Sequence, residues 1–277
     1  MLQTMLKTCA VSALAAAAFA ASAAAECQLD ESGYPATAAG FIQTASSCLE
    51  TPPAGVIYRP DLEQRLAELV NADRVEVGLK PLILRSGLID ASRLHAADMA
   101  TSGYTQHRDA LNRGHADRLR VVDRTLLSGM SGENIAFVPA DKFDGDVAAL
   151  LTALKAHPAN NQNIRRDGFT HMGVGVSETE TGVYLTQVFV RLEGELAAPM
   201  PASLASRERI IADFLRPGQD VYGWRLVTPE GETLAQRRGR GLTASDINQT
   251  AYLDVAVRDD VDDTVRYVRG PMLSGGQ

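Results

Sequence analysis

Apolar residues recur at helical spacing in three stretches of the first part of the chain, at residues 60–77, 86–102 and 144–156. Leu, Val and Ala return there every three or four positions, and polar residues fill most of the remaining positions. This spacing places the apolar side chains on one stripe of a helix. The pattern therefore predicts three amphipathic helices, with His95 as a packing residue on the apolar stripe of the second.

The apolar period changes from helical to extended after residue 170. Residues 172–176 and 182–190 are rich in β-branched and aromatic side chains, and the polar residues between them favour a turn. They predict an antiparallel pair of strands. Helices followed by such a pair, without a strand–helix–strand rhythm, indicate an α+β or three-layer domain.

The last third of the chain is predicted to form a separate β-rich unit. Prolines and alanines at residues 195–201 are typical of a linker. After it we expect a short helix at residues 206–215 and a frayed tail from Leu273 onward. Strands are expected at residues 222–227, 252–257 and 264–268.

The N-terminus has the composition of an export signal. Lys7 precedes an uncharged, Ala-rich stretch that ends in Ala23-Ala24-Ala25, the small residues that a signal peptidase recognises. We expect cleavage after residue 25, and the alternative is an uncleaved N-terminal anchor. No later segment is apolar and long enough to cross a bilayer, so no membrane span is expected after signal removal.

Two cysteines follow the signal, Cys27 and Cys48. In an oxidising compartment this pair most simply forms one disulfide, which would staple an irregular leader at residues 26–59. Chain-entropy models give about 3 kcal/mol of stabilisation for a loop of this length. Signal and cysteines together predict an exported protein, in the periplasm or outside the cell.

Charge narrows the range of partners. The formal net charge of −7 argues against nucleic-acid binding, which depends on Lys and Arg that neutralise phosphates. Residues 237–240, Arg-Arg-Gly-Arg, are a local exception. No aromatic residues interleave with them to stack on bases, so they predict a solvated turn.

Short motifs in the middle of the chain form an ordered set. It includes residues 69–74, 78–82 and 96–100, then Tyr104-Thr105-Gln106-His107 and Gly132-Glu133-Asn134-Ile135-Ala136, and it closes with His157-Pro158-Ala159-Asn160, residues 173–176 and residues 186–189. The set resembles the CAP superfamily, also called SCP-like domains, in its bacterial form. The resemblance covers about half of the chain and implies a three-layer α-β-α sandwich with a cleft.

The expected organisation combines this resemblance with the composition of both ends. It comprises a signal peptide at residues 1–25, a disulfide-stapled leader at 26–59, a CAP-like domain at 60–193 and a β-rich C-terminal extension at 202–277.

The resemblance also implies which residues face the cleft. His107 matches the first cleft His, Glu133 matches the Glu of the Gly-Glu-Asn motif, and His157 matches the second His. From their own chemistry, Asn134 and Asn160 are expected to order the surrounding loops through side-chain to backbone hydrogen bonds.

A fourth polar position of the family is absent from this chain. Relatives carry Glu or Ser there, whereas the equivalent positions here are Leu151 and Leu154, which neither bind a metal nor transfer a proton. Two imidazoles and one carboxylate still suit a divalent metal such as zinc and leave a position open for water. One interpretation is thus a metal held by His107, Glu133 and His157. The other is that Glu133 caps a turn while both His are hydrogen-bonded.

Three functions remain open. Leu151 and Leu154 favour an apolar cleft wall, and therefore a binding module for a small hydrophobic ligand such as a lipid or sterol rather than an enzyme. A metal-assisted, peptidase-like hydrolase is the alternative. The third function is that of an envelope or extracellular interaction protein, whose C-terminal extension contacts a cell-envelope component through residues 237–240. Ser131 lacks the Gly-x-Ser-x-Gly elbow, and nucleotide-binding motifs are absent.

Overall fold

The computed structural model describes Cys27, Leu29, Pro35 and residues 37–275. The predicted signal peptide at residues 1–25 lies outside the described residues. No helix among the described residues is long and apolar enough to cross a membrane. The α-helices are α1 Ala38–Glu50, α2 Pro60–Glu76, α3 Ser86–Ser102, α4 His115–Val122, α5 Val147–Ala156 and α6 Pro158–Ile164. Two 3-10 turns are η1 Ala140–Lys142 and η2 Ala244–Asp246.

Most of the strands belong to one sheet, in the order β1-β4-β5-β3-β12-β11-β8-β9, with β2 beside β4 and β7 beside β5. Strands β6 and β10 form a separate pair. The bounds are β1 Ile57–Tyr58, β2 Ile83–Leu84, β3 Leu126–Pro139, β4 His171–Thr179, β5 Gly182–Leu196, β6 Glu208–Arg209, β7 Ala212–Phe214, β8 Gln219–Val227, β9 Thr233–Arg238, β10 Gly241–Leu242, β11 Ala251–Asp259 and β12 Val265–Leu273.

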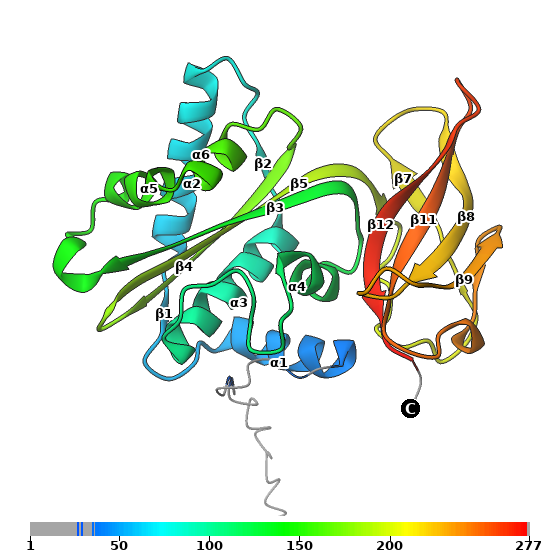
Figure 1. The fold of residues 1–277 in the computed structure, drawn as a ribbon, viewed down its shortest axis with the longest axis horizontal. Helices are drawn as coiled ribbons and strands as arrows, with labels where there is room; N and C mark the ends of the chain where they lie inside the picture. The colour runs from blue at the N-terminus through cyan, green and yellow to red at the C-terminus, as the bar shows by residue number, and fades with distance from the viewer. Residues whose placement is uncertain (1–26, 28, 30–34, 36, 276–277) are drawn as a thin grey trace, which may run out of the picture.

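Helices cover both faces of the first half of this sheet (Figure 1). Helices α2, α5 and α6 pack on one face of β3, β4 and β5, and α3 and α4 pack on the other. Helix α1 lies against α3 and α4. The α+β class and the three-layer α-β-α sandwich predicted from the sequence are confirmed.

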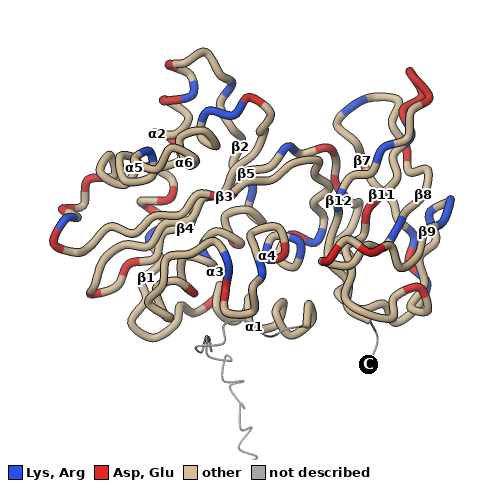
Figure 2. The backbone as a smooth tube through the Cα atoms, viewed as in Figure 1, with Lys and Arg blue, Asp and Glu red and all other residues tan. Residues whose placement is uncertain are grey.

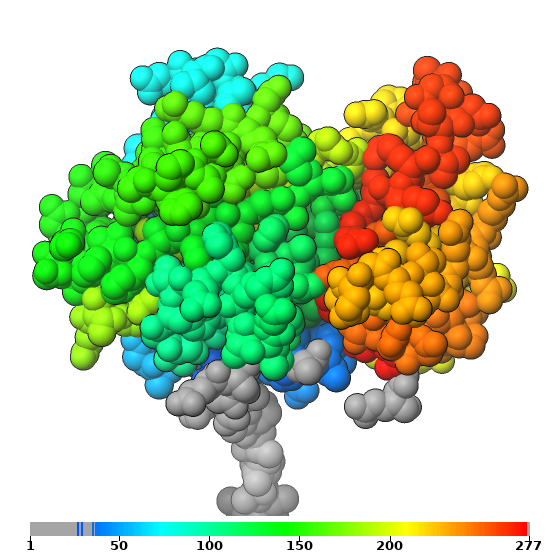
Figure 3. Space-filling model, in the orientation of Figure 1, coloured from blue at the N-terminus to red at the C-terminus, as the bar shows by residue number. Residues whose placement is uncertain are grey.

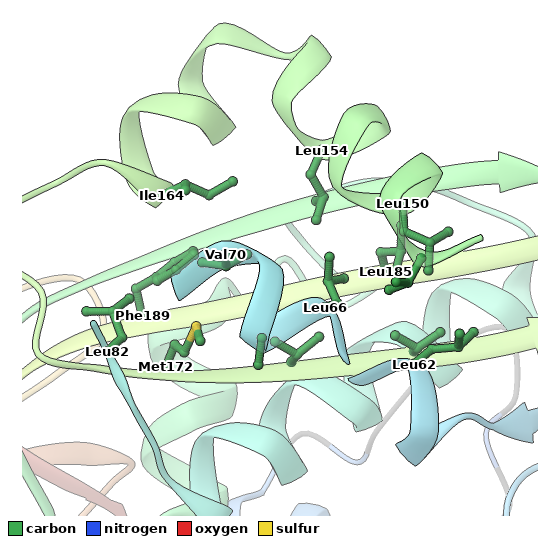
Figure 4. Close-up of a cluster of buried hydrophobic side chains, with 14 of the residues drawn as sticks. Leu62, Leu66, Val70, Leu82, Leu150, Leu154, Ile164, Met172, Leu185 and Phe189 are labelled. Atoms are coloured by element: carbon green, nitrogen blue, oxygen red, sulfur yellow. The ribbon is translucent and has the colours of Figure 1, made fainter. Parts of the chain in front are cut away.

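Strand β5 shows why both layers form. Its residues alternate between two apolar clusters, with Leu185 and Phe189 beneath α2 and α5 and with Val188 and Val190 beneath α3. Successive side chains of a strand point to opposite faces, and a run that is apolar at every position is buried on both. Figure 4 shows Leu185 beside Leu150 of α5 and Phe189 beside Val70 of α2.

Two glycines allow helix α3 to lie directly on strand β4. A Cβ atom at Gly173 would lie 2.1 Å from the backbone carbon of Leu88, and one at Gly175 would lie 2.2 Å from the backbone carbon of Ser92. No side chain fits between backbones at that separation. The Gly-Val-Gly-Val motif is therefore the contact surface of this helix.

The C-terminal unit continues the same sheet. Strand β12 pairs with β3 through Arg269 and Ser128, so β12, β11, β8 and β9 extend the CAP-like half. Two arginines from the end of α4 and the segment after it reinforce the junction. Arg120 donates to the carbonyl of Arg269 at 2.7 Å, and Arg124 donates to that of Met272 at 2.7 Å.

The structure differs from the prediction in three segments. Residues 206–215 form strands β6 and β7, because buried Ile210 between exposed neighbours follows a period of two rather than a helical one. The leader is not irregular, since Thr37 caps α1 and Phe41 and Cys48 lie on its buried side. The tail is not frayed at Leu273, which is fully buried in β12.

The predicted disulfide between Cys27 and Cys48 is present, with an S–S distance of 2.01 Å. Cys48 lies near the end of α1, among the apolar residues between that helix, α3 and α4. The disulfide therefore links the start of the described chain to the helical layer formed by α1, α3 and α4.

Candidate functional site

Glu133 lies at the centre of the polar residues that the sequence singled out. It sits on β3 with its side chain 1% exposed. Oε1 accepts a hydrogen bond from Nη2 of Arg118 at 2.7 Å, and Oε2 lies 2.9 Å from Nδ1 of His107. The structure thus brings Glu133 and His107 together as the family resemblance implied.

The charge of Glu133 is strongly stabilised. Burial by itself raises the pKa of this carboxyl, but the guanidinium of Arg118 and the hydrogen bond with His107 outweigh burial and lower the pKa to about 2. The carboxylate is therefore ionised at any physiological pH. A general base works best with a pKa near the working pH, so Glu133 is poorly suited to accept a proton.

Arg118 was missed by the sequence analysis. It lies on α4 and is 2% exposed. Besides Glu133 it donates to the carbonyls of Arg113 at 2.7 Å and His107 at 3.1 Å. It therefore fixes the segment that carries His107 onto β3. The Arg-rich composition of residues 108–124 concealed it, because a buried Arg and a solvated Arg look alike in sequence.

His115, on α4, is half-buried. Its Nε2 lies 3.1 Å from the hydroxyl of Ser131, and burial lowers the pKa of the imidazole. His95 behaves as predicted: it is fully buried, and its Nε2 lies 3.0 Å from the carbonyl of Gln106.

Asn134 and Asn160 connect strand β3 to helix α6. Asn134 Nδ2 donates to the carbonyl of Asn160 at 3.0 Å, and Asn160 Nδ2 donates to the carbonyl of Ile135 at 3.1 Å. Asn163 adds a bond of 3.0 Å to Asn134 Oδ1. These are the side-chain to backbone bonds expected of both residues, and they fix the start of α6.

His157 lies outside the cluster around Glu133. It lies at the junction of α5 and α6 and is exposed. Across residues 37–275 and the three described residues before them, no group of three or more His, Cys, Asp and Glu side chains is arranged to hold a metal ion.

The donor set fits a divalent metal poorly. Both oxygens of Glu133 already have partners, and the positive charge of Arg118 lies 2.7 Å from one of them. A dication bound by the same carboxylate would be repelled by that guanidinium and would have to displace His107. Of the second interpretation, the hydrogen bond of His107 agrees with this geometry, whereas Glu133 lies in strand β3 instead of capping a turn.

Leu154 does not line a cleft. It is fully buried in the cluster between α2, α5 and the sheet, where Figure 4 shows it above Leu66. Leu151 packs partly against the same cluster. The expectation that these leucines form an apolar cleft wall is wrong, because α5 turns its apolar stripe into the core.

The largest pocket described lies where the two halves of the molecule meet, and its volume is about 730 Å³. One wall is the segment from Arg108 to Asp117, and the other comes from the turn at Pro229-Glu230 and from β11 and β12. The space-filling view shows these teal and gold segments meeting along a seam (Figure 3). The hydroxyl of Tyr252 donates to Asp117 across it.

The middle of the chain matches a known protein family. Residues 67–190 match the model of the family described as "CAP: Cysteine-rich secretory protein family". The Bacillus subtilis protein YkwD, described as uncharacterized, is 30% identical over 128 residues, which are 46% of each chain. The chain thus spans about half the length of this curated relative.

Two solved structures are similar to part of this chain. An extracellular protein containing an SCP domain from Bacillus anthracis is 26% identical, with a TM-score of 0.42 over 48% of this chain and 41% of that one. An outer surface protein of Borrelia burgdorferi is 12% identical, with a TM-score of 0.44 over 50% of this chain and 98% of that one.

Proposed function

We propose that this chain, which carries a CAP domain of the cysteine-rich secretory protein family at residues 67–190, is an exported binding protein for a small hydrophobic ligand. The observation that carries the proposal is the pocket of about 730 Å³ at the seam between the CAP domain and the C-terminal sheet. Its volume lies within the range of about 300–1,000 Å³ that is usual for small-molecule sites.

The lining of the pocket suits a ligand with an apolar body and a polar end. Leu111, Tyr252 and Met272 contribute apolar surface. Leu111 is 41% exposed and lines the pocket. The rest of the lining is largely charged or polar and includes Arg108, Arg269, Asp117 and Glu230. Such groups orient a ligand whose polar end they contact.

Binding accords with the chemistry of the site better than catalysis does. Glu133 is held as a carboxylate with a pKa of about 2, and both of its oxygens have partners. Exposed His157 lies outside this cluster. Glu133 is therefore a poor general base, and the described residues form no group of three ligands for a metal, which favours binding over a metal-assisted hydrolase.

Export is supported by two features of the N-terminal region. The sequence ahead of Glu26 has the charge, apolar stretch and small residues of a signal peptide. The disulfide between Cys27 and Cys48 is of the kind that persists in oxidising compartments.

The test is native mass spectrometry of the mature chain with palmitate and with cholesterol. We expect one molecule of at least one probe to bind, and Leu111→Asp to weaken binding by about tenfold or more, since a carboxylate would face the apolar body. Leu215→Asp is the matched control, because Leu215 is 58% exposed and does not line the seam pocket. Equal binding by both variants would place the ligand elsewhere, and no binding of either probe would refute a hydrophobic ligand.

A further inference from the structure

A second hollow, of about 440 Å³, lies at the rim of the C-terminal unit, away from the seam pocket. Its lining is Arg207, Glu208, Arg209, Arg240 and Gly241. These residues come from two segments that are more than thirty positions apart. Strands β6 and β10 bring them together, with Arg209 opposite Gly241.

The charged residues that line this hollow are three arginines and one carboxylate, Glu208, which leaves an excess of positive charge. Arg240 forms an ion pair with Asp220. Arg207 and Arg209 are exposed, and neither forms an ion pair with another described residue. Figure 2 shows further Lys and Arg positions gathered beside the end of β9. In a chain with a formal net charge of −7, this is a local concentration of positive charge.

Gly241 gives one of these arginines its place. A Cβ atom at position 241 would lie 2.5 Å from Nη2 and 2.9 Å from Nε of Arg207, so the guanidinium occupies the space that a side chain would take. The backbone of Gly241 adopts no positive φ, so its lack of a side chain is not explained by a turn. The missing side chain of Gly241 thus leaves room for the guanidinium of Arg207.

We propose that this hollow is an anion site that takes a phosphate group. Guanidinium groups bind oxyanions through paired N–H donors, and these charge-assisted bonds are stronger than neutral ones. Three arginines line this hollow beside Glu208, so several N–H donors are available to one oxyanion, and phosphate has more acceptor oxygens for them than a carboxylate has. The proposal does not depend on the ligand of the seam pocket.

The protein contains its own reporter for this site. Trp224 is the single tryptophan of the chain, and its Nε1 donates to the carbonyl of Gly241 at 2.8 Å. An anion bound beside Gly241 changes the electric field at that indole. Tryptophan emission therefore reads this hollow directly, and the seam pocket has no tryptophan in its lining.

The experiment titrates the mature chain with inorganic phosphate at low ionic strength and follows Trp224 emission. We expect a saturable change that added NaCl weakens. The double variant Arg207→Gln/Arg209→Gln should weaken binding by about tenfold or more, since it removes two cationic hydrogen-bond donors from the hollow. Arg216→Gln is the control, because Arg216 is exposed, lines no described pocket and should leave affinity unchanged.

The variant Gly241→Ala distinguishes a site with fixed arginine positions from a general attraction of anions to positive charge. It keeps every arginine but displaces the guanidinium of Arg207, so it should weaken phosphate binding several-fold. Unchanged affinity in this variant, or equal losses in Arg216→Gln and the double variant, would overturn the proposal.

Co-sedimentation with vesicles of phosphatidylglycerol, compared with vesicles of phosphatidylcholine, then identifies the source of the phosphate group. Selective retention assigns a lipid headgroup, and retention on neither assigns a free phosphate, provided that inorganic phosphate binds. Absence of both phosphate and vesicle binding would refute the site.

Discussion

The two halves of the large sheet handle charge in opposite ways. In the CAP half, which is the part of the sheet formed by β1 to β5, helices cover both faces. The ion pair of Arg118 with Glu133 is buried there, with side chains 2% and 1% exposed. In the C-terminal half, Asp254 on β11 accepts from Arg225 and Arg269, which are 32% and 36% exposed. These two arginines also lie over the rings of Tyr267 and Tyr252.

The difference follows from how many layers cover the sheet. A charge between two layers cannot be hydrated, so it requires a complete set of partners in the protein. The carboxylate of Asp254 is only 3% exposed, but its two arginines keep contact with water, so it depends less on any one partner. The two halves should therefore respond very differently to the same substitution.

The largest effect is expected from Arg118→Met. It leaves the carboxylate of Glu133 buried without its cation, and unfolding free energy should fall by about 3–5 kcal/mol. The matched change Arg225→Met should cost about 1 kcal/mol or less, because Asp254 keeps Arg269. Urea denaturation of both variants measures the difference. Similar losses in the two halves would contradict the comparison.

A smaller contrast is expected between two glycines. Gly175→Ala pushes a methyl group into the backbone of α3, where Ser92 lies 2.2 Å away, and should cost about 1–3 kcal/mol or more. Gly241→Ala meets only the flexible end of Arg207 and should change stability by less than about 0.5 kcal/mol. Thermal unfolding followed by circular dichroism tests both. A stable Gly175→Ala protein would show that α3 can move away from β4.

Acid should destabilise the CAP half in two steps. Burial lowers the pKa of His95 from 6.5 to about 3, so the unfolded chain takes up a proton that the folded chain refuses, and stability falls as pH drops from about 6.5 to 3. Glu133, with a folded pKa of about 2 against 4.5, loses its contribution as pH falls from about 4.5 to 2.

His115 and His171, whose pKa values are also lowered by burial, act in the same direction as His95. Unfolding free energy measured between pH 7 and 5 should therefore decline in the wild type. The slope should be shallower in His95→Gln. An equal slope in both proteins would assign the acid sensitivity to groups other than His95.

The smallest effect is expected from the loss of His107, a metal ligand predicted from the sequence. Because Arg118 lies beside Glu133 and His157 lies apart, the purified mature chain should hold little zinc after dialysis, and His107→Ala should leave the zinc content unchanged. Elemental analysis of both proteins measures this. One zinc per chain in the wild type and none in His107→Ala would restore the metal site predicted from the sequence.

Much of the CAP half was predictable because its signals are local or carried by family motifs. Helices α2 and α3 were predicted from a period of three to four residues, and β4 and β5 from their apolar runs. Residues 206–215 were predicted wrongly, because charged residues flanking one buried isoleucine fit a helix as well as a strand. Only the pairing of β6 with β10 separates the two.

The site was predictable only in part. The resemblance identified His107 and Glu133, which lie 2.9 Å apart, but neither Arg118 nor the seam pocket. Arg118 gives no sequence signal that distinguishes it from the exposed arginines near it. The pocket needs residues from positions 108–117 and 229–272, and no local pattern relates segments that far apart.

By itself, the sequence determined helices α2, α3 and α5, strands β4 and β5, and the pairing of Cys27 with Cys48. The reason is that periodicity and composition act within a few residues. Only the tertiary structure decided that the C-terminal unit extends the same sheet, that Glu133 is neutralised by Arg118, and that two hollows are lined by arginines. These depend on burial and on contacts between distant segments, which set the energy of every charge in the molecule.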